Sequence, residues 1–289
     1  MKPPPFEYVA ASSAADVVEA LRRHGDDAKV LAGGQSLIPM LALRLARPSA
    51  LVDINGCSDL DGLAESGGTL TVGALVRQRA LEKWAATHSP LFAEALRWVA
   101  HAPIRNRGTV VGSLVHADPA SELPALLLCL DGEVTARRKG GERVIPADKL
   151  YVAPLTTSLE SDEVATAARF TLLPEGAGWG FAEVARRHGD FALVGSTAVL
   201  ALDGAGAVSH ARLGFFGVGG TPVRSAPGEA ALMGQQPTAA RVTEAARAAA
   251  AALSPDGDIH ASAGYRKTVA ATLAERVLAT ALSRCRRAG

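Results

Sequence analysis

Two glycine-containing turns constrain the fold of this chain more than any other feature of its sequence. The first, Leu31-Ala32-Gly33-Gly34-Gln35-Ser36-Leu37, ends an apolar segment and precedes a helix expected from Ile38. The second is Arg107-Gly108-Thr109-Val110-Val111-Gly112-Ser113. Backbone N–H groups at the start of a helix lack partners within it and attract anions, and glycine lets a phosphate oxygen approach the backbone. The turns therefore predict a site for the two phosphates of a dinucleotide.

Neither turn has the spacing of a standard nucleotide-binding fingerprint. No G-x-G-x-x-G follows a strand, which argues against a Rossmann domain, and no G-x-x-x-x-G-K-S/T is present, which argues against a P-loop hydrolase. Taken alone, Gly33-Gly34 also fits an ordinary strand-to-helix connection with Ser36 as the N-cap. We expect Gly33 to adopt a positive φ and to leave room for the pyrophosphate.

Length, composition and charge predict two globular domains and exclude several classes of protein. The 289 residues are 48% hydrophobic and carry a net charge of +1, which suits two buried cores but no nucleic-acid partner. We expect a cytoplasmic chain, because the sequence has neither a transmembrane segment nor an apolar signal core at its start. Cys57, Cys129 and Cys285 form no C-x-x-C pair, and the histidines have no metal-binding spacing, so no metal site is expected in this chain.

The expected elements change character twice along the chain. Up to about residue 56, a helix over 15–23 and a β-α-β unit over 29–54 predict a small parallel sheet. From 57 to 175 the pattern is mixed, with strands over 69–72, 108–115, 133–136, 143–145 and 164–172, and helices over 76–86, 90–100 and 118–130. After a Pro/Gly-rich connector, strands over 180–185, 195–202 and 211–218 precede two helices, 239–253 and a second with a buried stripe of Tyr265, Val269, Leu273 and Val277.

The segment after the second turn carries further candidate ligands. Thr109 can offer its hydroxyl, and residues 110–113 can offer consecutive backbone N–H groups. Asp118 followed by Pro119 predicts an N-cap with proline at the first helical position. Glu122 lies one turn into that expected helix, where it either accepts a hydrogen bond from ribose or adenine or lies on a solvated face.

Several motifs in order resemble the FAD-binding medium subunit of molybdenum hydroxylases, with the carbon monoxide dehydrogenase medium subunit as the nearest type. They are AGGQSLIP over 32–39, RNRGTVVGSL and HADP over 105–119, and ARRHGDFA over 185–192, followed by matches over 212–224 and 262–266. The resemblance implies an α+β fold. A PCMH-type, vanillyl-alcohol-oxidase-like FAD-binding module would occupy residues 1–175, with subdomains of about 1–56 and 57–175, and a flavoprotein C-terminal domain would occupy 176–289.

The resemblance also implies where the cofactor lies. The pyrophosphate of FAD would lie between residues 32–36 and 109–113, and the flavin ring would lie toward the C-terminal domain. Phe191 either packs on the ring or belongs to the core beside Leu193. The residues implied to contact FAD are Leu31, Ala32, Gly33, Gly34, Gln35, Ser36, Leu37, Ile104, Thr109, Val110, Val111, Gly112, Ser113, His116, Ala117, Asp118, Glu122, Val164, Ala165, Glu183 and Phe191.

Val111 departs from the family pattern. The family has Thr-x-Gly-Gly where this chain has Thr109-Val110-Val111-Gly112. A β-branched side chain fits there only if its φ is negative and the side chain points away from the phosphate. We expect FAD binding to be weaker than is usual in the family.

The resemblance implies an electron-transfer role within a larger enzyme. A molybdopterin-binding large subunit would hydroxylate the substrate, and a small subunit with 2Fe–2S clusters would pass electrons to the FAD of this chain, which would pass them to an external acceptor. The assembly would be a heterotrimer or its dimer. Two alternatives remain at this point: a stand-alone flavin oxidase or reductase of the same fold superfamily, and a scaffold that lost FAD through Val111.

Overall fold

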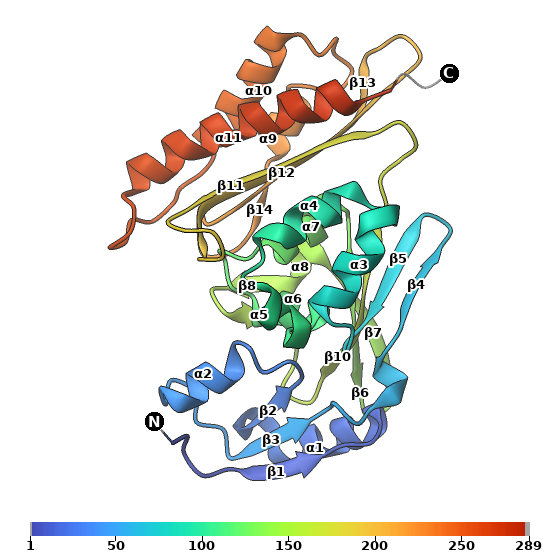
Figure 1. Cartoon of the computed structure of the whole chain (residues 1–289), viewed down its shortest axis with the longest axis vertical. Coiled ribbons are helices and arrows are strands. Elements are labelled where there is room, and N and C mark those ends of the chain that lie inside the picture. Colours follow the sequence, from blue (N-terminus) through green and yellow to red (C-terminus); the bar gives the residue numbers. More distant parts are fainter. Residues whose placement is uncertain (1, 287–289) are drawn as a thin grey trace.

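The computed structural model describes residues 2–286 and has three layers stacked along its longest axis (Figure 1). A small sheet near the N-terminus forms one end, helices and a larger sheet form the middle, and a sheet under two long helices forms the other end (Figure 1). Among the described residues, no helix has both the length and the apolar character required to cross a bilayer.

The N-terminal layer is a parallel three-stranded sheet, as the β-α-β pattern predicts. Its strands are β1 (Glu7–Ala10), β2 (Ala28–Leu31) and β3 (Ala50–Asp53), with β3 in the centre. The sequence patterns did not reveal β1. Helix α1 (Ala14–His24) connects β1 to the 3-10 turn η1 (Gly25–Asp27) before β2, and α2 (Leu37–Ala42) follows the first glycine turn.

The middle layer contains an antiparallel five-stranded sheet and most of the short helices. Its strand order is β4-β5-β10-β6-β7, with bounds β4 (Leu63–Ser66), β5 (Thr69–Gly73), β6 (Glu133–Arg138), β7 (Gly141–Pro146) and β10 (Val164–Thr171). The remaining elements are η2 (Ser58–Leu60), α3 (Gln78–His88), α4 (Pro90–Trp98), α5 (Ala102–Arg107), α6 (Val110–His116), α7 (Glu122–Cys129), α8 (Ala147–Leu150), β8 (Tyr151–Ala153) and β9 (Thr156–Thr157).

Two expectations for the middle layer are wrong, and one helix was missed. The strand expected over 108–115 is helix α6, because Thr109 caps it and Val110, Val111 and Leu114 bury one helical face in the core. The helix expected over 118–130 begins only at Glu122. Helix α5 was not expected at all.

The C-terminal layer is an antiparallel sheet covered on one face by two helices (Figure 1). Its strands, in order, are β11 (Gly178–Ala185), β12 (Ala192–Leu202), β13 (Val208–Phe216) and β14 (Val223–Arg224), and its helices are α9 (Ala226–Ala230), α10 (Ala239–Ala251) and α11 (Ala263–Arg284). Helix α11 can approach β11 closely because Gly178 and Gly180 have no side chain. A Cβ at either position would overlap the backbone of α11. The buried stripe of α11 includes Leu273 and Val277 as expected, but Tyr265 is 46% exposed and lies outside it.

Candidate functional site

The two glycine turns meet in space, and Gly33 is at the point of contact. A Cβ on Gly33 would overlap the carbonyl oxygen of Arg107 and would lie 2.8 Å from Cα of Gly108. The expected positive φ at Gly33 is wrong, because it occurs at Gly34, where φ is 72°. Glycine is therefore required at position 33 by a backbone crossing and at position 34 by the turn itself.

Two polar side chains that the sequence reasoning missed link these turns. The Asn55 amide donates to the carbonyl of Ala32 at 2.9 Å, and Arg77 donates to Oδ1 of Asn55 at 2.6 Å. A second guanidinium nitrogen of Arg77 donates to the carbonyl of Arg107, also at 2.6 Å. The chain Ala32–Asn55–Arg77–Arg107 thus fixes the first turn against the second. Neither residue lies in a recognisable motif, so only their positions just after β3 and β5 could have suggested them.

The first turn offers free backbone donors. Within the described chain, the N–H groups of residues 33–36 donate to no protein acceptor. Gln35 stabilises the turn by donating from its amide to the carbonyl of Gly33 at 3.2 Å. Ser36 occupies the expected N-cap position of α2, but its side chain makes no capping hydrogen bond. These groups leave the first turn able to bind an anion.

The second turn is organised differently from the expected row of free N–H groups. Val110 donates to the carbonyl of Val76 at 3.0 Å, and Gly112 donates to Oγ1 of Thr109 at 3.1 Å. Ser113 donates to the carbonyl of Thr109 at 3.1 Å. Because Thr109 accepts the bonds from Gly112 and Ser113 as the cap of α6, and Val110 is bonded to Val76, the second turn contributes mainly a rigid backbone wall to the site.

The side chain of Val111 points away from this wall. It is 2% exposed and belongs to the hydrophobic core, and its φ is not among the positive values of the chain. The condition under which valine fits at this position is therefore met.

Glu122 lies in the interface between the middle and C-terminal layers, so the expectation of a solvated helix face is wrong. It shares one face of α7 with Ala125 and Cys129, which pack against the C-terminal sheet. Its side chain is buried, and burial together with the charge of Asp118 raises its pKa to about 7.

Glu183 lies on β11 opposite Gly195 and on the same face of the sheet as Phe181. Both of its carboxylate oxygens are buried without a hydrogen-bond partner among the described residues. Burial raises its pKa to about 8, and the nearby charge of Glu122 adds to the shift. In the part of the chain that the structure describes, these two acids share the interface without a cation partner, and a proton on at least one of them makes their burial tolerable at neutral pH.

The segment between α6 and α7 is a turn rather than the start of a helix. Asp118 accepts a hydrogen bond from the backbone of Ala120 at 2.9 Å, so it caps this turn and not α7. His116 ends α6, and Ala117 follows it in the left-handed region with φ of 55°. Asp118 is therefore a cap, as expected, but it caps the turn before α7 and not a helix.

Four other residues implied to contact FAD lie in contrasting surroundings. Phe191 is 69% exposed, so it does not pack in the core beside Leu193, and Ile104 on α5 is 37% exposed. Val164 and Ala165 are buried in β10. Exposed apolar side chains at Phe191 and Ile104 are available to a planar ligand.

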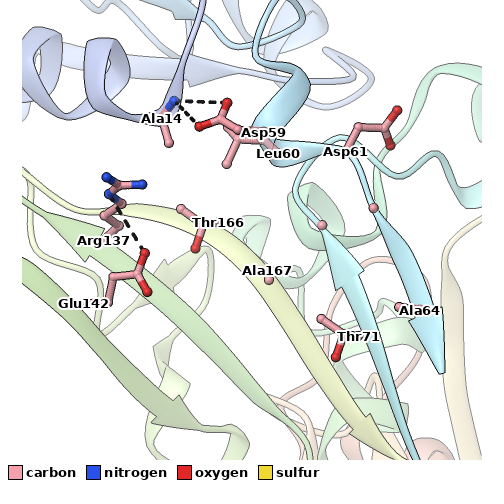
Figure 2. A pocket seen from close by; sticks show the side chains of 12 residues that line it. Ala14, Asp59, Leu60, Asp61, Ala64, Thr71, Arg137, Glu142, Thr166 and Ala167 are labelled. Carbon is pink, nitrogen blue, oxygen red and sulfur yellow. Dashed lines mark hydrogen bonds and ion pairs between the residues drawn. The ribbon is translucent and has the colours of Figure 1, made fainter. Parts of the chain in front are cut away.

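A shallow groove of about 310 Å³ lies elsewhere, between α1 and the five-stranded sheet (Figure 2). Asp59 points to the start of α1 and accepts from the N–H of Ala14 at 3.0 Å, while Arg137 and Glu142 face each other across β6 and β7 (Figure 2). None of the residues implied to contact FAD lines this groove.

Comparison with known proteins decides the family. Residues 4–170 match the model of the FAD binding domain in molybdopterin dehydrogenase, and residues 179–281 match the CO dehydrogenase flavoprotein C-terminal domain. The chain belongs to the FAD-binding subunits of the molybdenum hydroxylases. The expected α+β fold, with an FAD-binding module followed by a flavoprotein C-terminal domain, is confirmed.

Relatives match this FAD subunit over nearly its whole length. It is 43% identical over 288 residues to the 6-hydroxypseudooxynicotine dehydrogenase complex subunit alpha of Paenarthrobacter nicotinovorans, covering 99% of this chain and 97% of that one. Carbon monoxide dehydrogenase from Hydrogenophaga pseudoflava has a chain with a TM-score of 0.95 and 37% identity, with 99% and 100% covered. Quinoline 2-oxidoreductase from Pseudomonas putida 86 has a chain with a TM-score of 0.91 and 35% identity, and the match covers 98% of this chain and 99% of that one.

The observed residues fit an FAD subunit. The free N–H groups of residues 33–36 suit a pyrophosphate, and the Gly33 contact leaves no room for a side chain between the turns. FAD, when bound, supplies the chemistry of accepting electrons and passing them on. The subunit works with a large molybdenum subunit and a small iron–sulfur subunit, as in the carbon monoxide dehydrogenase type of complex.

Proposed function

We propose that residues 33–36 bind the pyrophosphate of FAD, and that Phe191 and Ile104 flank the flavin ring. The observation that carries this proposal is the row of unpartnered N–H groups in the first turn, held against the second turn by Asn55 and Arg77. Thr109 contributes by fixing the wall formed by α6. The remaining residues named from the resemblance are candidates for the same site.

We further propose that the chain is the electron exit of its complex. Electrons from the 2Fe–2S clusters of the small subunit would reach the FAD of this chain and leave to an external acceptor. In the wider family the relatives are named for very different substrates, including carbon monoxide and quinoline. Substrate choice therefore belongs to another subunit.

The domain limits and the compartment are also proposals. We place the boundary between the FAD-binding domain and the C-terminal domain at residues 175–176. Two hydrophobic clusters support it, one formed by residues 11–170 together with Val199 and the other by residues 194–281. We place the complex in the cytoplasm, where free cysteines such as the buried Cys57 and Cys129 remain reduced.

Gly33→Val tests the cofactor site. A valine Cβ would collide with the Arg107 carbonyl and separate the two turns, so the variant should lose FAD binding measured by reconstitution of the apoprotein. Gly141→Val is the matched control, because a Cβ there has no atom within 4 Å and the residue lies in strand β7. Retention of FAD by Gly33→Val, or failure of the unaltered chain to bind added FAD, would contradict the proposed site.

A further inference from the structure

The loop over residues 186–191, between β11 and β12, carries Phe191 and rests on a histidine from another part of the chain. Gly189 in this loop has φ of 86°. A Cβ there would lie 2.7 Å from Nε2 and 2.9 Å from Nδ1 of His101. The imidazole of His101 therefore packs against the backbone of Gly189, and no other residue type fits this position without moving the ring.

A second histidine extends the contact. His188 meets Trp98 edge to face, with ring centroids 5.7 Å apart, and meets His101 in the same manner at 6.1 Å. Trp98 ends α4 and His101 is the N-cap of α5, so three rings from two helices and the loop form one cluster. Such edge-to-face contacts favour a defined geometry in addition to burying apolar area.

The base of the cluster is rigid. Buried Arg105 donates to the carbonyls of Val99 and Ala100 at 2.9 and 3.0 Å and pairs with Glu82 at 3.0 Å. These bonds fix the turn between α4 and α5, in which Ala100 has φ of 42°. The position of His101 is thus set by a buried guanidinium and not by solvent-exposed contacts.

Helix α5 connects this base to the phosphate turns. His101 precedes it, and Arg107, its last residue, presents the carbonyl that meets Gly33. Exposed Ile104 lies between them on the same short helix. One rigid helix therefore carries the support of the loop at one end and the contact with the first glycine turn at the other.

We propose that His101 is a positioning residue that holds the 186–191 loop so that Phe191 covers one face of the flavin ring. This inference rests on the proposed function. The imidazole contacts Gly189 and His188, and it acts through the loop without touching the cofactor. Removing it frees the loop from α5 while the phosphate turns stay intact.

A double-mutant cycle between His101 and Phe191 tests this role in the full-length chain reconstituted with FAD. The readout is quenching of flavin fluorescence by iodide, which rises when one face of the ring becomes accessible, together with the flavin midpoint potential. Phe191→Ala defines full exposure of that face. His101→Ala should raise iodide quenching toward the same level with FAD affinity nearly unchanged, and the double variant should show no further rise.

Two companion variants control for stability and for surface effects. Gly189→Ala displaces the loop from His101 without deleting the imidazole, so it should reproduce the His101→Ala result even if His101→Ala folds poorly. His88→Ala is the matched control, because His88 is also an exposed histidine with a ring contact, in its case to Trp84, but it lies on α3. It should leave both readouts unchanged.

The outcomes separate this inference from the proposed function. If the unaltered chain binds no FAD, the proposed function fails. If FAD binds but His101→Ala and Gly189→Ala match His88→Ala, the positioning role is overturned. Additive effects of His101→Ala and Phe191→Ala would also overturn it, as would unchanged iodide quenching in Phe191→Ala.

Discussion

At Gly33, the absence of a side chain lets two backbone segments from distant parts of the sequence touch. The requirement is steric, since a Cβ would overlap the carbonyl of Arg107, whereas the positive φ belongs to Gly34. Val111 illustrates the opposite case, in which a side chain that conflicts with the family pattern has moved into the core. Single residues at this site therefore act through packing as much as through direct contact with phosphate.

Val111→Gly is expected to destabilise the protein. The change removes a buried side chain and places glycine inside α6, for a combined cost of about 2–3 kcal/mol. Urea denaturation of the apoprotein measures this loss. Val144→Gly provides the control. Val144 is 52% exposed on β7, so its replacement removes no core contact. A stability equal to that of the unaltered chain would show that the core does not depend on Val111.

Arg77→Met is expected to weaken FAD binding. The change removes both hydrogen bonds that tie Asn55 to Arg107, so the first turn loses its fixed position against the second. We expect a loss of about 1–2 kcal/mol, or roughly tenfold in Kd, measured by titration of the apoprotein with FAD. Arg79→Met is the matched control on α3, where Arg79 pairs with Glu82. Equal FAD affinities of Arg77→Met and Arg79→Met would show that the hydrogen bonds of Arg77 do not contribute to FAD binding.

At the scale of elements, α7 and β11 bring two buried acids into one interface. Glu183 has no hydrogen-bond partner among the described residues, and burial raises its pKa to about 8 from an ordinary value of 4.5. The folded state therefore binds a proton that the unfolded state releases above pH 4.5. The contribution of Glu183 to the free energy of unfolding should therefore be constant below pH 4.5, fall as the pH rises toward about 8, and level off above it.

Glu183→Gln is expected to flatten this pH dependence. The amide copies the shape of the protonated acid but cannot ionise, so the variant should gain about 2 kcal/mol over the unaltered chain near pH 9 and little near pH 5. Urea denaturation at the two pH values measures the difference. Glu65→Gln, on exposed strand β4, should change neither. Parallel pH profiles for Glu183→Gln and the unaltered chain would show that Glu183 is ionised in the fold.

The elements that the sequence predicted poorly share a physical cause. Residues 110–115 are rich in β-branched side chains, which favour strands, yet the cap at Thr109 and the core contact of Leu114 stabilise a helix there. Strands β2 and β3 of the N-terminal sheet and the C-terminal hairpins were predictable, because their apolar strands are bounded by clear turn signals. Local patterns failed where tertiary contacts decided the element.

The candidate site shows the same limit. Its glycine turns could be read from the sequence, since their composition reports a local requirement. The contributions of Asn55 and Arg77 could not, because their hydrogen bonds join segments far apart in the chain. The burial of Glu122 and Glu183 likewise arises only when the C-terminal sheet packs on α7.

At the scale of the whole molecule, the layered arrangement assigns separate tasks to the two domains. The N-terminal and middle layers (Figure 1) supply the phosphate turns, and the C-terminal sheet supplies the 186–191 loop, which contacts His101 at the start of α5. The substrate-oxidising centre of the complex lies in the molybdenum subunit, so this chain handles electrons and leaves substrate binding to its partner.

The isolated chain is therefore expected to have no hydroxylase activity of its own. Reconstituted with FAD, it should show only slow reoxidation of chemically reduced flavin by oxygen or a dye, because electrons reach the flavin from an iron–sulfur cluster. Adding the small and large partner subunits should restore substrate-dependent bleaching of the flavin, followed by stopped-flow absorbance. The Gly33→Val chain with the same partners is the control and should restore none. Turnover of an organic substrate by the isolated chain, with molybdenum and iron absent by elemental analysis, would instead identify a stand-alone flavin oxidase.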